Sequence, residues 1–311
     1  MALDAQAKAF LESIASTGAP ALSTMTPEQG RAFFGQMHAL GGEVEEVAKV
    51  ENHVIQVADG EFKVRVYTPE GTGPFPLFIY YHGGGYVVGD VDLVDRLSRT
   101  ITNAAQVIVV SVDYRLAPEH KYPVPVNDGY AAVEWAYNNA GHFNGDASRI
   151  AVGGDSAGGN LAAVTSLKAK QEKGPHITAQ VLLYPVTDFA CESESYNENG
   201  TDYNLTTLDM IWFRDHYLSS ATEIEDVYVS PLRSNNLADL PQALIITAQF
   251  DPLRDDGARY AEKLKQYGNQ VEYQCYEGMI HGFAWFAGVL DQGKAVITHV
   301  SHYLKQAFEQ K

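Results

Sequence analysis

Gly154-Asp155-Ser156-Ala157-Gly158 is the stretch of sequence that decides the fold. It follows a short β-branched run, Ile150–Gly153, and precedes a helical stretch, Asn160–Lys170. A serine in a sharp turn between strand and helix projects its hydroxyl above the sheet, and larger side chains two positions away would clash there. The positive N-terminal end of the helix favours negative charge at that point. The pattern predicts Ser156 as a nucleophile supported by Gly154, Asp155 and Gly158.

Glycine-rich turns also occur in phosphate-binding loops and in dinucleotide-binding sites. G-x-S-x-G matches arise by chance, so the motif alone is weak. A phosphate-binding loop would carry a lysine after the last glycine, where this chain has Asn160-Leu161. Since no G-x-G-x-x-G follows a strand either, a dinucleotide site is not indicated. The position between a strand and a helix favours the nucleophile.

Outward from this turn, the sequence alternates strands and helices. Continuous apolar runs are typical of strands buried on both faces of a parallel sheet. They occur at Leu77–Tyr81, Val107–Val112, Ile150–Gly153, Val181–Tyr184, Leu244–Thr247 and Val271–Tyr276. Helical patterns cover Asp128–Asn138, Asn160–Lys170, Gly257–Tyr267 and Gly288–Phe308. A hairpin is expected around Asp59-Gly60, which gives an α/β fold with about eight mostly parallel strands and helices on both faces.

A second glycine-rich loop, His82-Gly83-Gly84-Gly85, directly follows the Leu77–Tyr81 strand. Ester hydrolysis passes through an oxyanion that needs preorganised N–H donors, and glycine allows the backbone to approach the substrate closely. We expect Gly84 and Gly85 to donate from this loop and Ala157 to donate from the serine turn. His82 is expected to brace the loop, with Gly83, and not to act as the base.

The remaining catalytic groups are predicted from strand ends. On this kind of sheet the serine is followed in the chain by an acid after the penultimate strand and a histidine after the last. Asp251 follows the Leu244 strand and His281 follows the Val271 strand, at the edge where ligands bind in open α/β sheets. The rival acids Asp255 and Asp256 are expected to serve as first-turn charges of the next helix. No H-E-x-x-H or Cys/His spacing indicates a metal site.

Composition excludes several classes of protein. Of 311 residues, 22 are Lys or Arg and 39 are Asp or Glu, a formal net charge of −17, which argues against nucleic-acid binding. The two cysteines, Cys191 and Cys275, cannot build a disulfide scaffold and are expected to be reduced and partly buried. No signal-peptide pattern and no apolar run long enough for a membrane span are visible, so a cytoplasmic protein is expected.

Two segments depart from the alternation of strands and helices. Residues 1–45 read as helical, with Thr26-Pro27-Glu28-Gln29 as a capping box and Phe33, Met37 and Leu40 at helical spacing up to Gly41-Gly42. Pro185–Pro241 is far longer than a normal crossover. Its first part, Cys191–Asn204, reads as polar turns, and a helical patch follows at Leu208, Ile211, Trp212 and Tyr217. These segments either pack as plain helices or cover the site. If they cover it, Trp212 and Phe213 are candidate walls of the acyl pocket. Phe33 and Phe34 are equally consistent with a pocket wall and with packing in the core.

Five blocks, in order, resemble the hormone-sensitive-lipase-like (family IV) bacterial carboxylesterases of the α/β-hydrolase superfamily, over nearly the whole chain. They are Tyr80–Tyr86, Asp113–Glu119, Gly154–Gly159, Asp251–Asp255 and His281–Phe283. The resemblance implies a catalytic core from residues 46–185 and 241–311, and a helical cap from residues 1–45 and 186–240. It also implies that the Asp113–Glu119 block is scaffold and that no cofactor is needed.

The residues predict ester hydrolysis by Ser156, His281 and Asp251 through an acyl-enzyme, and the resemblance implies that the substrates are short- to medium-chain carboxylic esters. The expected partner is a small-molecule ester, and the protein is expected to be a monomer or homodimer. An amidase, lactonase or deacetylase with the same triad remains open, because nothing in the sequence fixes the leaving group. A ligand receptor of the same fold is disfavoured because all three triad residues are present.

Overall fold

A computed structural model describes residues 2–309, which form one eight-stranded sheet with the strand order β1-β2-β4-β3-β5-β6-β7-β8. The strands are β1 Lys49–Val57, β2 Gly60–Thr68, β3 Phe75–Tyr81, β4 Ile108–Asp113, β5 Gly145–Asp155, β6 Ala179–Leu183, β7 Gln242–Phe250 and β8 Val271–Ile280. The first three strands in this order pair antiparallel and the others pair parallel. The predicted eight-stranded, mostly parallel sheet is confirmed.

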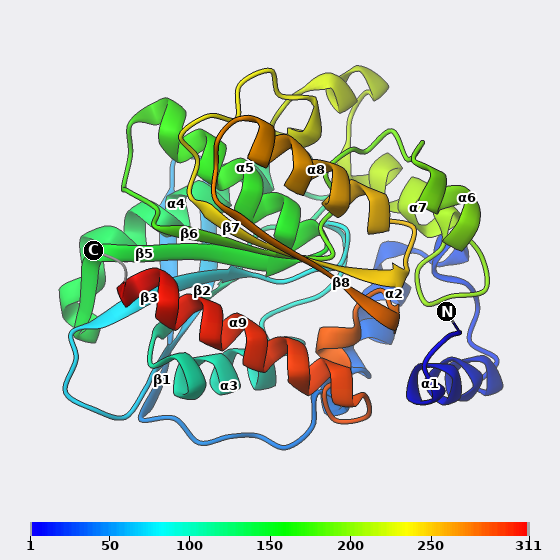
Figure 1. Cartoon of the computed structure of the whole chain (residues 1–311), viewed down its shortest axis with the longest axis horizontal. Helices are drawn as coiled ribbons and strands as arrows, with labels where there is room; N and C mark the ends of the chain where they lie inside the picture. Colours follow the sequence, from blue (N-terminus) through cyan, green and yellow to red (C-terminus); the bar gives the residue numbers. More distant parts are fainter. Residues whose placement is uncertain (1, 310–311) are drawn as a thin grey trace.

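Helices cover both faces of the sheet, as predicted. The helices of the described chain are α1 Ala5–Ser16, α2 Pro27–Gly35, α3 Asp95–Ala105, α4 Val124–Asn139, α5 Ala157–Glu172, α6 Glu194–Asn199, α7 Thr207–Tyr217, α8 Arg254–Gln266 and α9 Asp291–Glu309. Helices α4, α5 and α8 lie on one face and α3 and α9 on the other (Figure 1). Every residue of β3 and β6 is buried, which explains the continuous apolar runs Leu77–Tyr81 and Val181–Leu183 within them. A separate hydrophobic cluster fills each side of the sheet.

The predicted hairpin and helix start are confirmed, but the helix end is not. Strands β1 and β2 pair with Val57 opposite Gly60, and Thr26 and Gln29 form the reciprocal capping box of α2. Helix α2 ends at Gly35, although the apolar spacing predicted a helix as far as Leu40. A 3₁₀ turn, His38–Gly41, follows it. Glycine weakens a helix, and Arg96 of α3 donates to the His38 carbonyl oxygen at 2.7 Å, which ties this segment to the core.

The long connection after β6 also differs in part from its prediction. Cys191–Asn204 is not all turns, because it contains the short helix α6. The Asp255 carboxylate accepts the Ser195 backbone N–H at 2.9 Å, and so stabilises the first turn of α6 from a distant part of the chain. The predicted helical patch is α7, within which Tyr217 is fully buried and Leu208 is 66% exposed.

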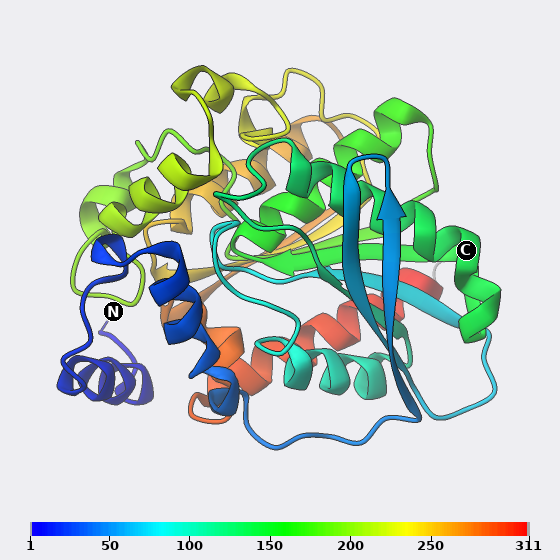
Figure 2. The same ribbon diagram turned by 180° about the vertical axis from the view of Figure 1, so that it is seen from behind.

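The N-terminal helices and the long connection gather at one end of the sheet. In Figures 1 and 2, α1, α2, α6 and α7 all lie at the end of the sheet where β7 and β8 have their carboxyl ends. Over residues 2–309, helices of the length and apolarity needed to cross a bilayer are absent. Both cysteines are free and partly buried, as predicted.

Candidate active site

Ser156 occupies a strained turn between β5 and α5. Its backbone has φ 56° and ψ −117°, a conformation that non-glycine residues rarely adopt, and its N–H donates to the Leu183 carbonyl oxygen at 2.8 Å. Cβ atoms added at Gly154 or Gly158 would overlap the Tyr81 carbonyl oxygen. The two glycines therefore let β3 pass close to the turn, and the hydroxyl is aimed above the sheet.

His281 and Asp251 meet Ser156 at this edge. Each is the first residue after its strand, β8 and β7 respectively. The His281 Nε2 atom lies 3.0 Å from the Ser156 Oγ, and the His281 Nδ1 atom lies 2.7 Å from the Asp251 Oδ2. The other Asp251 oxygen accepts the Leu253 N–H at 2.8 Å, so the carboxylate is fixed at both ends. The structure thus brings the three sequence-predicted residues into one hydrogen-bonded chain.

The two rival carboxylates have other partners. Asp255 accepts the Ser195 N–H, as described above. Asp256 is fully buried, and its Oδ2 accepts the backbone N–H groups of Thr187 and Asp188 at 2.9 and 3.0 Å. Burial raises the pKa of Asp256 to about 7. Both residues lie in the first turn of α8, and they hold the connection after β6 against it.

Gly84 and Gly85 line the same cavity as Ser156. Their φ angles are 112° and 61°, and a Cβ on Gly85 would overlap the ring of Phe213. In the part of the chain that the structure describes, the N–H groups of Gly84, Gly85 and Ala157 donate to no protein acceptor. The three predicted donors are thus free to bind an oxygen atom.

His82 lies below this loop, away from the cavity. It is fully buried, its Nδ1 atom lies 2.7 Å from the Gly83 carbonyl oxygen, and its ring stacks on Tyr114 with centroids 4.4 Å apart. Burial lowers the pKa of the imidazole, which keeps the ring neutral. The Tyr114 hydroxyl donates to the His82 carbonyl oxygen at 2.7 Å. This packing fixes the backbone that leads into Gly83.

Asp155, next to the nucleophile, is a buried carboxyl. The Tyr80 hydroxyl donates to its Oδ1 atom at 2.8 Å, and burial raises its pKa to about 7. Its other oxygen faces Gly83, where an added Cβ would overlap it and would also lie 2.7 Å from the Trp285 ring. Asp155 therefore packs β3, the Gly83 loop and the segment after His281 against one another.

The cavity above Ser156 has a volume of about 240 Å³. Its apolar walls come from both segments of the predicted cap, residues 1–45 and 186–240. They include Leu22, Phe33, Phe34, Leu205 and Phe213. Trp212, also predicted as a wall, is not among the lining residues. Its indole Nε1 donates to the Met25 carbonyl oxygen at 3.2 Å, and its ring covers Gly30. Trp212 therefore joins α7 to the N-terminal segment. The next residue, Phe213, is the one that faces the cavity.

Sequence reasoning missed three residues that support the triad. Asn204 donates to the His281 carbonyl oxygen at 3.0 Å, and Asn199 donates to the Asp251 carbonyl oxygen at 3.3 Å. The Tyr184 ring packs edge-on against the His281 ring, with centroids 4.8 Å apart. Single asparagines in a polar stretch carry no signal of such a role. Tyr184 ends a strand-like run, which showed only that it would be buried.

The Asp113–Glu119 block is built into the scaffold through two arginines. Arg115 contacts the fully buried Asp128 with its Nη2 at 2.7 Å and its Nε at 2.9 Å. Arg31 of α2 binds both Glu119 oxygens, at 2.8 and 2.6 Å, and also donates to the Val87 carbonyl oxygen at 2.9 Å. The block thus connects α2 to the loop that carries Gly84 and Gly85.

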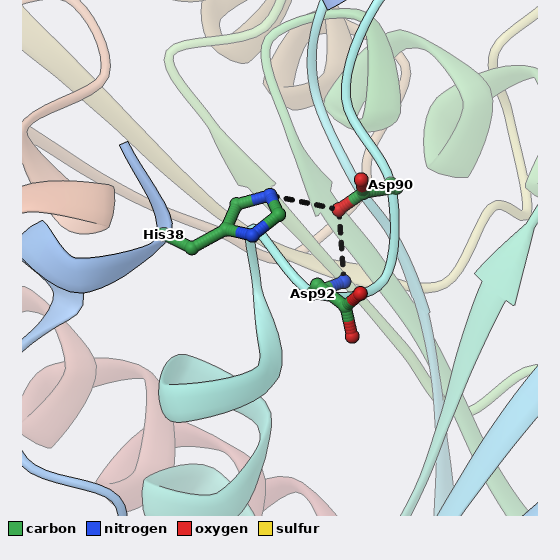
Figure 3. Close-up of side chains that lie close together, drawn as sticks. All are labelled: His38, Asp90 and Asp92. Atoms are coloured by element: carbon green, nitrogen blue, oxygen red, sulfur yellow. Dashed lines mark hydrogen bonds and ion pairs between the residues drawn. The ribbon is translucent and has the colours of Figure 1, made fainter. Parts of the chain in front are cut away.

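One cluster outside the cavity has the composition of a metal site. His38, Asp90 and Asp92 each place a ligand-type atom within 4.8 Å of the others (Figure 3). Their bonding favours a structural role, because Asp90 Oδ1 already accepts the Asp92 and Leu93 N–H groups and the Asp92 carboxylate pairs with Arg65 at 2.6 Å. The cluster joins the turn after α2 to the loop that precedes α3.

Comparison with known proteins identifies relatives over most of the chain. A profile of the alpha/beta hydrolase fold matches residues 78–285. The carboxylic ester hydrolase LipN of Mycobacterium tuberculosis is 45% identical over 230 residues, which are 72% of this chain and 61% of that protein. The carboxylesterase NlhH of the same organism is 43% identical over 238 residues, 74% of this chain and 73% of its own length.

A solved structure extends the likeness to both ends of the chain. The hyperthermophilic esterase from the archaeon Pyrobaculum calidifontis superposes with a TM-score of 0.94 and is 36% identical. The match covers 98% of this chain and 99% of the esterase. The N-terminal helices and the long connection are therefore included in the shared architecture, together with the sheet.

Proposed function

The chain belongs to the α/β-hydrolase fold family and to its hormone-sensitive-lipase-like branch, and on that premise we propose that it is a serine carboxylesterase acting on short- to medium-chain carboxylic esters. The observation that carries the proposal is the chain of hydrogen bonds Ser156–His281–Asp251 beside a small apolar cavity with free backbone N–H groups. Pockets for drug-sized ligands are roughly 300–1,000 Å³, so a cavity of about 240 Å³ favours small substrates.

The first step is acylation of the serine. His281 Nε2 takes the hydroxyl proton as Ser156 Oγ attacks the ester carbonyl carbon, and the carbonyl π electrons move onto the oxygen. The N–H groups of Gly84, Gly85 and Ala157 bind this oxyanion, each worth about 3 kcal/mol. Asp251 holds the imidazole in the tautomer that presents Nε2 as the acceptor and stabilises the imidazolium. The oxyanion then collapses, the bond to the alkoxy oxygen breaks, and His281 gives that oxygen its proton.

The second step releases the acid. Water takes the place of the alcohol, and His281 removes one of its protons as the water oxygen attacks the acyl carbon. The same N–H groups stabilise the second tetrahedral intermediate. Its collapse breaks the bond to Ser156 Oγ, which regains a proton from His281. No group besides the triad and the N–H donors is required for either step.

We propose that residues 1–45 and 186–240 form the cap over this site and that residues 46–185 and 241–311 form the catalytic core. Three contacts support the grouping of the two cap segments: the Trp212 bond to Met25, the packing of Trp212 on Gly30, and the Ser23 N–H donated to Asp209 at 3.0 Å. Both segments supply walls of the cavity. Deleting residues 1–40 is expected to change the chain-length preference; unchanged kinetics would contradict a cap role.

A p-nitrophenyl ester series from acetate to palmitate tests the activity. The wild type should be most active on short or medium chains, and Ser156→Ala should lose turnover on all of them. Ser148→Ala, an exposed serine at the start of the same strand, is the matched control and should behave as wild type. Turnover retained by Ser156→Ala would reject the nucleophile.

A matched pair of substrates distinguishes an esterase from an amidase. Comparing p-nitrophenyl acetate with p-nitroacetanilide changes an ester into an amide with the same acyl group. An esterase should prefer the ester by orders of magnitude, since an amine is the poorer leaving group. Comparable rates on both would favour the amidase reading.

We further infer a cytoplasmic enzyme that is a monomer or homodimer. Two free thiols, Cys191 and Cys275, are in keeping with a reducing compartment. Light scattering of the purified protein measures its mass, and a stable assembly larger than two chains would contradict the second part.

A further inference from the structure

A second hollow lies behind the active-site cavity. It is a groove of about 490 Å³ between α1 and the segment that runs from Phe33 to Leu40, with Val289 at its far side. Every side chain that lines it is uncharged, and Phe10, Leu40 and Val289 give it an apolar surface. Such a surface, open to solvent and free of charge, fits an aliphatic chain.

One layer of side chains separates this groove from the cavity above Ser156. Ile14, Phe33 and Met37 line both hollows. Met37 is partly exposed and lies two residues beyond the end of α2, outside the helix. Methionine is unbranched and has several rotatable bonds, so it adapts to an irregular gap. Of the three shared side chains, Met37 is therefore the one best able to move aside between the two spaces.

The groove is assembled on the segment that follows His281. The Phe10 ring packs on Phe286 with centroids 4.4 Å apart, and the Gly288 N–H donates to the Leu40 carbonyl oxygen at 2.9 Å. Phe34, beside the shared layer, packs edge-on against Trp285 at 5.9 Å. The groove thus lies on the His281 side of the cavity. In the proposed mechanism His281 delivers its proton to the alkoxy oxygen, so the alcohol part of the ester faces this side.

We propose that the groove binds the aliphatic tail of the alcohol part of the ester, and that Met37 controls access to it from the cavity. The inference rests on the proposed esterase function and specifies its substrate as esters of straight-chain alkyl alcohols. Each methylene moved from water into the groove is worth a factor of about four in binding. An alcohol with a charged tail gains nothing there, because the lining offers no counter-charge.

The n-alkyl acetates from ethyl to octyl test the proposal, because they all form the same acetyl-enzyme and differ only in the alcohol. Ser13→Trp fills the groove from α1 at a residue that lines the groove and not the cavity. The ratio of kcat/KM for octyl acetate to that for ethyl acetate should fall at least about fivefold. Ala15→Trp, exposed on the same helix and lining neither hollow, should keep the wild-type ratio.

Met37→Ala tests the access step. It should raise the octyl-to-ethyl ratio, and Met37→Ala combined with Ser13→Trp should remove that gain. The ratio of p-nitrophenyl octanoate to p-nitrophenyl acetate, which varies the acyl chain, should not respond to Ser13→Trp. Each ratio is taken on one preparation, so incomplete folding of a variant does not change it.

Two results would overturn the inference. An octyl-to-ethyl ratio unaffected by Ser13→Trp would show that the tail does not enter the groove. If Ser13→Trp lowered the ratio of p-nitrophenyl octanoate to p-nitrophenyl acetate and left the octyl-to-ethyl ratio unchanged, the groove would bind the acid part of the ester. If the wild type hydrolyses no ester at all, the proposed function fails as well. If it hydrolyses ethyl acetate and Ser13→Trp leaves the octyl-to-ethyl ratio unchanged, only the role of the groove is refuted.

Discussion

At the scale of single residues, the site depends on side chains that are distant in the chain and adjacent in space. Ser156 and His281 are 125 positions apart, and His281 and Asp251 are 30 apart. The spacing of glycines pointed to Ser156 because steric overlap with Tyr81 allows no side chain at Gly154 or Gly158. Positions at strand ends pointed to the other two. Asn199 and Asn204 could not be found this way, since only tertiary folding brings their amides to the triad backbone.

Exchanging one of two neighbouring carboxylates tests the assignment of the acid. Asp251→Asn should lower kcat about 10³- to 10⁴-fold, because the amide no longer holds His281 in the productive tautomer. Asp255→Asn is the matched control, since this carboxylate contacts Ser195 and Arg254 but not His281. Steady-state kinetics on p-nitrophenyl butyrate measure both. A larger loss in Asp255→Asn than in Asp251→Asn would reverse the assignment.

The buried carboxyl of Asp155 makes a testable contribution to stability. Its pKa of about 7 in the folded protein is above the ordinary value of 3.8, because burial disfavours the charged form. The folded state therefore holds this proton more tightly than the unfolded state does. The contribution is fully present below about pH 4 and is lost as the pH rises through about 7.

Asp155→Asn removes this titration and keeps an oxygen that can accept the Tyr80 hydroxyl. The wild type should therefore lose stability relative to the variant as the pH rises. The Tm of the variant minus the Tm of the wild type should be larger at pH 8 than at pH 5. Thermal melts at the two pH values measure the difference, and other titrating groups, including Asp256, cancel in the comparison. An equal Tm difference at both pH values would contradict the raised pKa.

At the scale of elements, features set by local sequence signals were predicted, and features set by contacts with distant parts of the chain were missed. The capping box at Thr26 and the turn before Gly60 are local features that the sequence states directly. The end of α2 and the presence of α6 depend on Arg96 and Asp255, which belong to other parts of the fold. Strand β8 continues to Ile280, past the predicted end at Tyr276, because its last residues are buried beneath the site.

The Arg31–Glu119 pair should stabilise the attachment of α2. Arg31 lowers the pKa of Glu119 to about 2 by binding its carboxylate. A lowered pKa contributes stability above the ordinary value of 4.5, and that contribution is lost as the pH falls toward 2. Glu119→Gln should lower stability by about 1 kcal/mol or less at pH 7, since the carboxylate is partly exposed.

Denaturant unfolding at pH 7 and pH 4 measures this effect. The difference between Glu119→Gln and wild type should be smaller at pH 4. Glu12→Gln, which breaks an exposed pair with Lys8, is the control and should leave stability nearly unchanged at both pH values. An effect of Glu119→Gln that grows on acidification would have the wrong sign.

At the scale of the whole molecule, the sequence pattern predicted the number and type of strands but not their order. Apolar runs mark buried strands, whereas the reversal that places β4 between β2 and β3 leaves no local trace. The sequence pattern left open whether the N-terminal helices and the long connection cover the site, and the resemblance to known esterases favoured that arrangement. Contacts such as Trp212 with Met25 show how this end is held together.

In the proposed enzyme, one serine, activated by His281 and Asp251, carries the acyl group. Labelling with a p-nitrophenyl alkylphosphonate, which transfers phosphorus to an activated serine, tests it most directly when the adduct is mapped by peptide mass spectrometry. One adduct is expected, on Ser156, with release of one equivalent of nitrophenol. It should form much more slowly in His281→Ala and be absent from Ser156→Ala. A stoichiometric adduct on any other residue, or labelling at the wild-type rate without His281, would contradict it.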